Sequence, residues 1–215
     1  FDYGSIQVII EGKDKAILKN LAERDGLQVY ALTTGLTPAG IDLGSEQFYS
    51  LRLPKPLLLV GEGVTYTEAG EIWHLLDTRV NVPLAMMDIN RTARINLNDY
   101  THLILPSGTY RGLIPEKVKE FVQAGGTLIA LSEGAEWASI NKISNVKVKN
   151  QAKAADEGKK QPYSLANAYE GAMETAGTIF ETTIDATHPI AYGYKQAKLP
   201  FFKSNNICFE DTNNP

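Results

Sequence analysis

The sequence is poor in the residues that most often bind metals or form cross-links. It contains one cysteine, Cys208, and three histidines, at positions 74, 102 and 188. A single cysteine excludes an internal disulfide and a cysteine-based zinc site, but it leaves the compartment open because secreted proteins need not contain disulfides. None of the histidines is followed three residues later by glutamate, as in the His-x-x-Glu pair of many zinc peptidases. We therefore assign no metal to this chain.

Long apolar runs, a surplus of positive charge and a nucleotide-binding glycine motif are also missing. The run Leu57–Val60 is far shorter than the roughly 20 residues that a membrane-spanning helix needs. The net charge is −4, and no basic stripe is present to bind phosphate backbones or anionic lipid. No Gly-x-Gly-x-x-Gly follows the first predicted strand. We expect no membrane span, no nucleic-acid partner and no dinucleotide cofactor.

The size and composition are those of a folded protein. The chain has 215 residues, of which 43% are hydrophobic, enough to bury a core in one domain or in one domain with a smaller partner. It begins with Phe1 rather than Met, and neither end has a signal-peptide pattern. We interpret the chain as a processed product or an excised piece.

The first part of the chain has the pattern of a small β-α-β unit. Ser5–Ile10 and Leu27–Thr33 are strand-like, and apolar residues at helical spacing lie between them. Two prolines then mark a seam in the sequence. We place a boundary near Leu53, between a unit at 1–53 and a domain at 54–215.

The larger domain alternates strand and helix patterns. Helices are predicted to begin at Thr65, which has capping-box spacing to Glu68, and at Pro115. Short apolar runs predict strands at 57–60, 84–88, 102–105 and 127–131. This alternation predicts an α/β fold with a doubly wound parallel sheet.

The last third of the chain is less regular. Thr178–Ile184 and Ile207–Phe209 predict two late strands. The polar stretch Asn150–Pro162 has no apolar period and predicts a solvated loop. We expect a frayed end at Asp211–Pro215.

The turns that follow the strands hold the candidate site. In parallel sheets of this kind, ligands bind beyond the carboxyl ends of the strands. Glu62, Ser107 and Ser132 lie in three such turns. We predict that these side chains are polar anchors for a small ligand or a peptide.

Ser132 is the candidate with the most specific sequence context. Ala130 and Gly134 keep its surroundings small, as a nucleophile elbow requires for close approach of the neighbouring backbone. One interpretation is a serine hydrolase in which His188 is the base and Glu133 orients it. The other assigns Ser132 to a helix cap, Glu133 to the helix dipole and His188 to hydrogen bonds that fix a turn.

Several motifs of the larger domain resemble a known fold family. HLILPSG (102–108), PEKVKEFVQAGG (115–126) and TLIALSEG (127–134) are similar to the class I glutamine amidotransferase-like fold over most of 54–140. The resemblance implies a flavodoxin-like α/β domain and places Ser132 where amidotransferases have their nucleophilic cysteine. Serine would suit the peptidase E-like dipeptidases of the same fold. The amidotransferase acid two residues after the late histidine is absent here, so the triad does not carry over as a set.

A second resemblance covers nearly the whole chain. FDYGSI (1–6), GIDLGSEQFYSLRLPKPLLLVGEG (40–63), EAGEIWHLLD (68–77) and THPIAYGY (187–194) resemble the region that follows the catalytic domain in large bacterial zinc carboxypeptidases. The resemblance implies a secreted or periplasmic metallocarboxypeptidase as the parent protein, with zinc in an upstream peptidase domain. It implies that this chain is a non-catalytic accessory domain whose partner is that peptidase domain.

Overall fold

The chain divides into two compact units. The computed structural model describes residues 5–10, 12, 14–37, 39–48, 50–149 and 162–211. One unit comprises Phe1–Arg52 with Glu181–Pro200, and the other comprises Leu53–Phe180 with Phe201–Pro215. The segment Glu181–Pro200, which the sequence analysis assigns to the larger domain, thus groups with the first unit.

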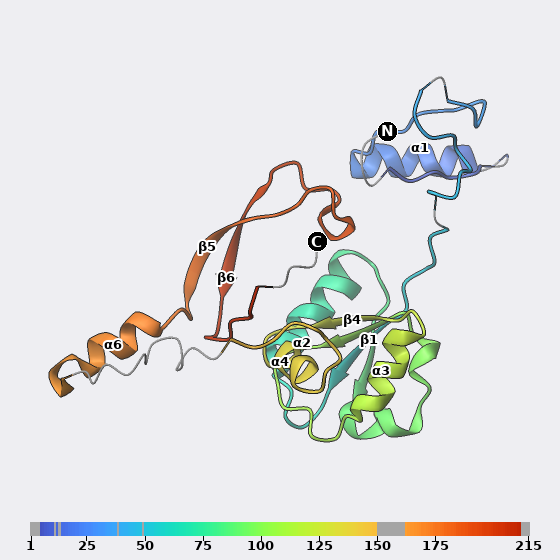
Figure 1. Ribbon diagram of the computed structural model, residues 1–215. Coiled ribbons are helices and arrows are strands. Elements are labelled where there is room, and N and C mark those ends of the chain that lie inside the picture. The colour runs from blue at the N-terminus through green and yellow to red at the C-terminus, as the bar shows by residue number, and fades with distance from the viewer. Residues whose placement is uncertain are drawn as a thin grey trace. The chain divides into compact units, whose positions relative to one another are not determined.

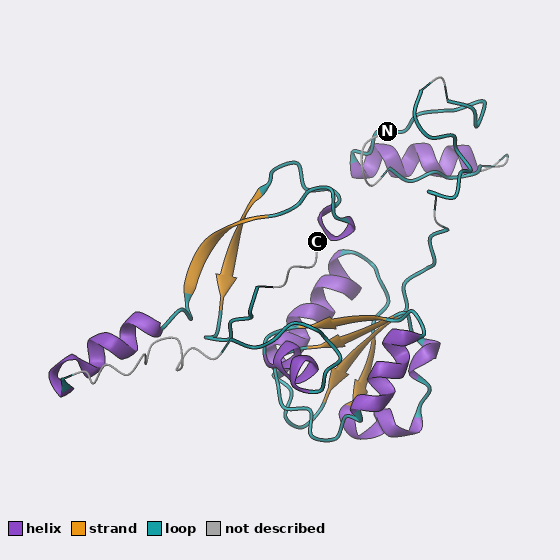
Figure 2. Ribbon diagram, viewed as in Figure 1, coloured by secondary structure: helices purple, strands orange, loops and turns teal. Residues whose placement is uncertain are grey.

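A four-stranded parallel sheet forms the centre of the second unit (Figures 1 and 2). Its strands are β1 (Pro56–Val60), β2 (Ala85–Asp88), β3 (His102–Leu105) and β4 (Thr127–Ala130), in the order β2-β1-β3-β4. All three neighbouring pairs are parallel, with Leu58 opposite both Met86 and Ile104. The prediction of an α/β fold with a parallel sheet is confirmed.

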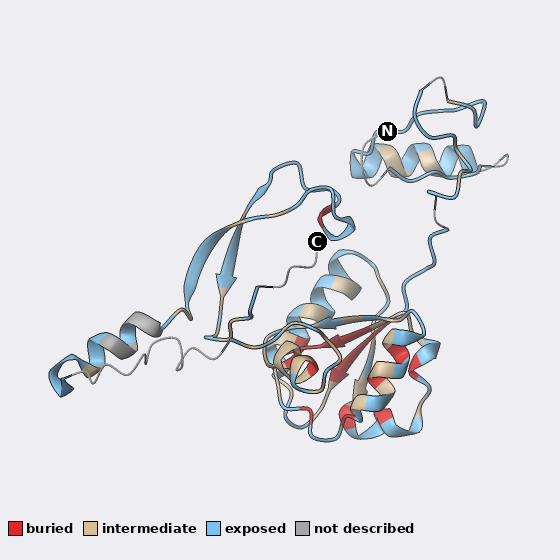
Figure 3. Ribbon diagram, viewed as in Figure 1, coloured by how far each residue is buried: buried red, intermediate tan, exposed pale blue. Residues whose placement is uncertain are grey.

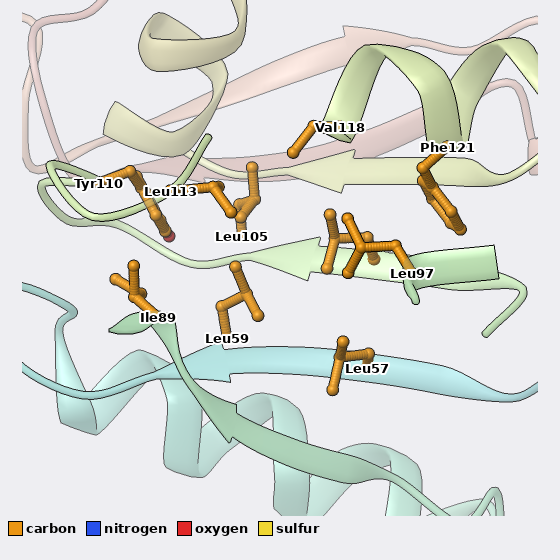
Figure 4. Packing of buried hydrophobic residues seen from close by; sticks show 10 residues of the cluster. Leu57, Leu59, Ile89, Leu97, Leu105, Tyr110, Leu113, Val118 and Phe121 are labelled. Carbon is orange, nitrogen blue, oxygen red and sulfur yellow. The ribbon is translucent and has the colours of Figure 1, made fainter. Parts of the chain in front are cut away.

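Helices pack on both faces of this sheet. Successive residues of a strand point to opposite sides, so a strand with only apolar residues has an apolar side chain to bury on each face. On one face, Leu57 and Leu59 pack with Val118 and Phe121 of α3 (Pro115–Gln123), as Figure 4 shows. On the other face, Leu58 packs with residues of α2 (Tyr66–Trp73). Burial on both faces explains why the central strands are continuous apolar runs (Figure 3).

The remaining elements of this unit connect the strands. A π-helical turn at His74–Arg79 extends α2, and 3-10 turns occupy Ile89–Arg94 and Leu97–Asp99. The helix α4 (Glu133–Ile140) follows β4, and its Trp137 packs on the α3 side of the core.

The late elements differ in part from the prediction. A 3-10 turn at Tyr163–Leu165, α6 (Ala166–Met173), β5 (Thr178–Thr183), a 3-10 turn at Pro189–Ala191 and β6 (Lys198–Lys203) follow in order. The strands β5 and β6 pair with each other in a separate sheet, so the predicted strand at Thr178–Ile184 is confirmed. The predicted strand at Ile207–Phe209 is wrong, because Phe209 pairs only with Val148 in an isolated bridge. Except for Pro162, the predicted loop Asn150–Pro162 lies outside the described residues, as does the predicted frayed end beyond Asp211.

The N-terminal β-α-β prediction is correct for its helix and wrong for its strands. The helix α1 spans Asp14–Asp25. Neither Ser5–Ile10 nor Leu27–Thr33 is a strand, and apolar side chains such as Ile9 are exposed there. A strand is stable only when its backbone pairs with a neighbour and one face is covered. In the described part of this unit neither segment has such a neighbour.

Candidate functional site

The turns after β1, β3 and β4 lie at one edge of the sheet, because the three strands are parallel. The first two turns are joined through their backbones. The Thr65 N–H donates to the Ser107 carbonyl at 2.9 Å, and the Thr109 N–H donates to the Gly63 carbonyl at 2.9 Å. Glu62 lies in the first turn with an exposed side chain. The predicted anchors Glu62, Ser107 and Ser132 therefore share this edge.

Ser132 has a backbone conformation that residues other than glycine rarely adopt. Its φ is 52° and its ψ is −121°, directly between β4 and α4. Two residues later, a Cβ on Gly134 would lie 2.7 Å from the Leu105 carbonyl oxygen and 2.9 Å from that of Pro106. Only glycine lets α4 start this close to the turn after β3. A sharp, strained strand-to-helix turn with a small residue at this spacing is the geometry of a nucleophile elbow.

The side chain of Ser132 does not cap α4. Ser132 holds the N-cap position, yet its hydroxyl makes no capping hydrogen bond. Its Oγ instead accepts a hydrogen bond from the Asn205 side-chain amide. The capping interpretation is therefore wrong for the side chain, because the hydroxyl contacts the Asn205 amide and not a backbone N–H of α4. An amide nitrogen has no free lone pair to take the serine proton, so this contact does not supply a base.

The carboxylate of Glu68 holds the turn after β3. Its Oε1 accepts a hydrogen bond from the Ser107 hydroxyl at 2.7 Å, and its Oε2 accepts one from the Ser107 N–H. The predicted capping box is wrong, since Thr65 occupies the N-cap position without a side-chain hydrogen bond. Two donors on one residue hold a carboxylate more strongly than the single N–H at the helix start.

Tyr110 links the same turn to α4. It is buried, its hydroxyl donates to the Pro106 carbonyl, and its ring lies 5.8 Å from the ring of Trp137. Burial raises the pKa of Tyr110 far above its ordinary value, and the negative charges of Glu68 and Glu133 raise it further. The phenol therefore stays neutral at physiological pH.

A depression of about 440 Å³ lies beside the first turn of α4. Its lining comes from α4, from the chain after that helix and from the C-terminal segment. Its lining residues are Glu133, Glu136, Val148, Lys149, Asn205, Asn206, Ile207 and Cys208. The predicted Glu133 thus lies at the helix start and borders a hollow whose volume is in the range of small-ligand sites.

His188 belongs to the other compact unit. It precedes the 3-10 turn Pro189–Ala191, and its Nδ1 accepts a hydrogen bond from the Ile190 N–H at 3.3 Å. This is the turn-fixing role of one sequence interpretation. The pairing of His188 with Ser132 stays a prediction, since the two residues lie in different units.

The other two histidines lie away from the carboxyl ends of the strands. His102 opens β3, and its Nδ1 lies 2.8 Å from the Thr101 hydroxyl. His74 is exposed at the end of α2. In the part of the chain that the structure describes, no three His, Cys, Asp or Glu side chains gather as metal ligands would. No helix among the described residues has the length and apolar character needed to cross a membrane.

Three residues of the site escaped the sequence analysis. The spacing of Glu68 from Thr65 indicates a capping box and not a contact with Ser107. Tyr110 follows the Pro-Ser-Gly turn closely, and an aromatic residue at that place indicates packing more readily than a polar link. Asn205 lies in a polar run with no motif, so only the folded chain reveals its contact with Ser132.

A scan against protein-family models, a search of curated proteins and a search of solved structures found no match to this chain.

Proposed function

We propose that this chain is an accessory domain of a zinc carboxypeptidase-type protein, and that its strand-end site binds a small ligand or peptide without hydrolysing it. The strand order β2-β1-β3-β4 and the helices on both faces support a flavodoxin-like, class I glutamine amidotransferase-like domain. In this proposal the zinc and the peptidase activity belong to an upstream domain. The parent protein is secreted or periplasmic.

The pairing of Ser132 with Asn205 carries the proposal. A nucleophilic serine needs a group that accepts its proton. Here the hydroxyl oxygen accepts a hydrogen bond from an amide donor. Within the described part of this unit, the two histidines lie at positions 74 and 102, away from the site. In the described part of this unit, the Ser132 hydroxyl therefore contacts an amide donor and no histidine, an arrangement that suits binding better than turnover.

The first unit supports contact with another domain. Apolar side chains of this unit are exposed, among them Ile9, which is 86% exposed, and Leu36, which is 74% exposed. An apolar hollow of about 610 Å³ lies between residues 31 and 48. Exposed apolar surface of this kind marks an interaction site. An upstream peptidase domain is the partner that the whole-chain resemblance implies.

One observation favours a second candidate function. The positive φ of Ser132 costs on the order of 1–3 kcal/mol, and such strain concentrates at functional sites. This favours a peptidase E-like serine hydrolase in which Ser132 is the nucleophile, His188 the base and Glu133 a supporting acid.

A serine-directed fluorophosphonate probe separates the two functions. The binding proposal predicts that the folded protein is not labelled, because in this proposal no histidine activates Ser132. Ser107→Ala serves as the matched control, since Ser107 is another serine at the same edge. Labelling that is lost in Ser132→Ala and in His188→Ala, but kept in Ser107→Ala, would establish the hydrolase instead.

Binding itself is measured by thermal unfolding with a panel of short peptides. We expect at least one peptide to raise the melting temperature, because a ligand that binds only the folded state stabilises it. Ser132→Ala should weaken the shift, and the peptide should be recovered intact. A panel that leaves the melting temperature unchanged would contradict a peptide-binding site.

A further inference from the structure

The C-terminal segment Lys203–Glu210, here called the strap, is anchored at its far end to the chain after α4. The Lys149 N–H donates to the Cys208 carbonyl at 2.7 Å, and the Glu210 N–H donates to the Lys147 carbonyl at 2.8 Å. The strap therefore has a fixed place beside the candidate site.

A second anchor holds the middle of the strap. The Asn206 Oδ1 accepts hydrogen bonds from the Thr175 N–H at 2.8 Å and the Ala176 N–H at 2.9 Å. Its Nδ2 donates to Glu174 at 2.6 Å. Because these partners precede β5, the strap is tied at this point to a segment distant in sequence.

Next to the second anchor, the Asn205 side chain contacts Ser132 in a defined orientation. Its Oδ1 accepts the Ile207 N–H at 2.9 Å, so the Nδ2 end of the same amide faces Ser132. The two ends of an asparagine side chain differ in this way, because the oxygen only accepts and the nitrogen only donates. The Ser132 hydroxyl is thereby held as an acceptor.

We propose that Asn205 is a positioning residue for Ser132 and that the strap closes the site in its resting state. The hydrogen bond occupies the face of Oγ that a ligand donor would use, and the strap forms one wall of the depression beside α4. A ligand that engages Ser132 must first displace Asn205. This inference rests on the proposed function and adds the control of access to the same site.

Cys208 reports strap opening without any ligand. It is the single cysteine of the chain, it is half-buried, and it lies in the strap. The rate at which its thiol reacts with a reagent such as Ellman's reagent therefore measures how often the strap moves away from the depression beside α4. Asn205→Ala removes the whole amide, both its donor to Ser132 and its acceptor for the Ile207 N–H. Ser132→Ala removes the acceptor.

We expect Ser132→Ala to raise the Cys208 reaction rate about three- to tenfold, the effect of losing one ordinary hydrogen bond. Asn205→Ala should raise the rate at least as much, because it also removes the acceptor of the Ile207 N–H. The double variant should react no faster than the faster single variant, because both changes break the same contact. Asn98→Ala, a change of an exposed asparagine in the same unit, should react like the unaltered protein.

Two outcomes would overturn the inference. One is a Cys208 rate in Ser132→Ala equal to that of the unaltered protein, with its thermal unfolding intact. The other is fully additive effects in the double variant, which would mean that the two residues act separately. The Cys208 rate is measured without a ligand, whereas the proposed function is tested by peptide binding. A failure of one proposal can therefore be distinguished from a failure of the other.

Discussion

Ser132 and Gly134 show how single residues shape the site. The positive φ of Ser132 and the close contact of Gly134 with the Leu105 and Pro106 carbonyls together fix where α4 begins. The turn is predictable from its small residues and its serine. The partner of the hydroxyl is not, because a serine before a helix has the same local sequence whether or not it caps.

The strain at Ser132 can be measured with two variants that both lack the hydroxyl. We expect Ser132→Gly to be more stable than Ser132→Ala by about 1 kcal/mol, because glycine adopts positive φ without a Cβ clash. Urea denaturation of the two variants gives the difference in the free energy of unfolding. Equal stabilities would mean that the turn is unstrained.

Tyr110 predicts a loss of stability in alkali. Its folded pKa is raised above the ordinary value of 10.0, so the neutral phenol stabilises the fold fully below pH 10 and this contribution falls as the pH rises further. We expect the free energy of unfolding of the unaltered protein to fall more steeply above pH 10 than that of Tyr110→Phe. Parallel curves for the two proteins, followed by urea unfolding between pH 8 and pH 11, would contradict the raised pKa.

At the scale of elements, contacts across the sheet edge, and not helix caps, hold the side chains of the site. The carboxylate of Glu68 joins α2 to the turn after β3, across 39 residues of sequence. The strands were predictable, since a strand buried on both faces is a short apolar run wherever it occurs. The segments Ser5–Ile10 and Leu27–Thr33 have the same local character but no neighbouring strand among the described residues, so the strand prediction is wrong there.

The Glu68 link is testable by a change that keeps its shape. Glu68→Gln should lower the free energy of unfolding by about 2 kcal/mol, because the charged acceptor of two hydrogen bonds becomes a neutral amide with one acceptor. Glu71→Gln, at an exposed position of the same helix, should change it by less than about 0.5 kcal/mol. Similar losses in both variants would assign the effect to the helix rather than to Ser107.

For the whole molecule, the buried core belongs almost entirely to the second unit. Among the described residues, the buried hydrophobic side chains lie between Leu57 and Ala138, with the single further case of Ala191. No side chain of α1 is buried. The first 52 residues therefore contribute little core to the fold.

Deletion of residues 1–52 should leave the sheet unit folded. We expect the shortened protein to keep its near-ultraviolet circular dichroism and a melting temperature within about 3 °C of the full chain, since a lost core contact of 1 kcal/mol would already shift a domain of this size by about 2–4 °C. A broad, non-cooperative transition would show that the N-terminal region supports the core after all.

The sequence by itself determined the parallel sheet, its helices and the edge where polar side chains gather. These features depend on the pattern of apolar and polar residues close together in the sequence. The tertiary structure alone decided which partners those side chains take. Asn205 meets Ser132 across 73 residues, and no local pattern encodes a contact at that separation. Pairing between distant segments depends on how each whole unit packs, and among the described residues the N-terminal apolar segments have no strand partner for the same reason.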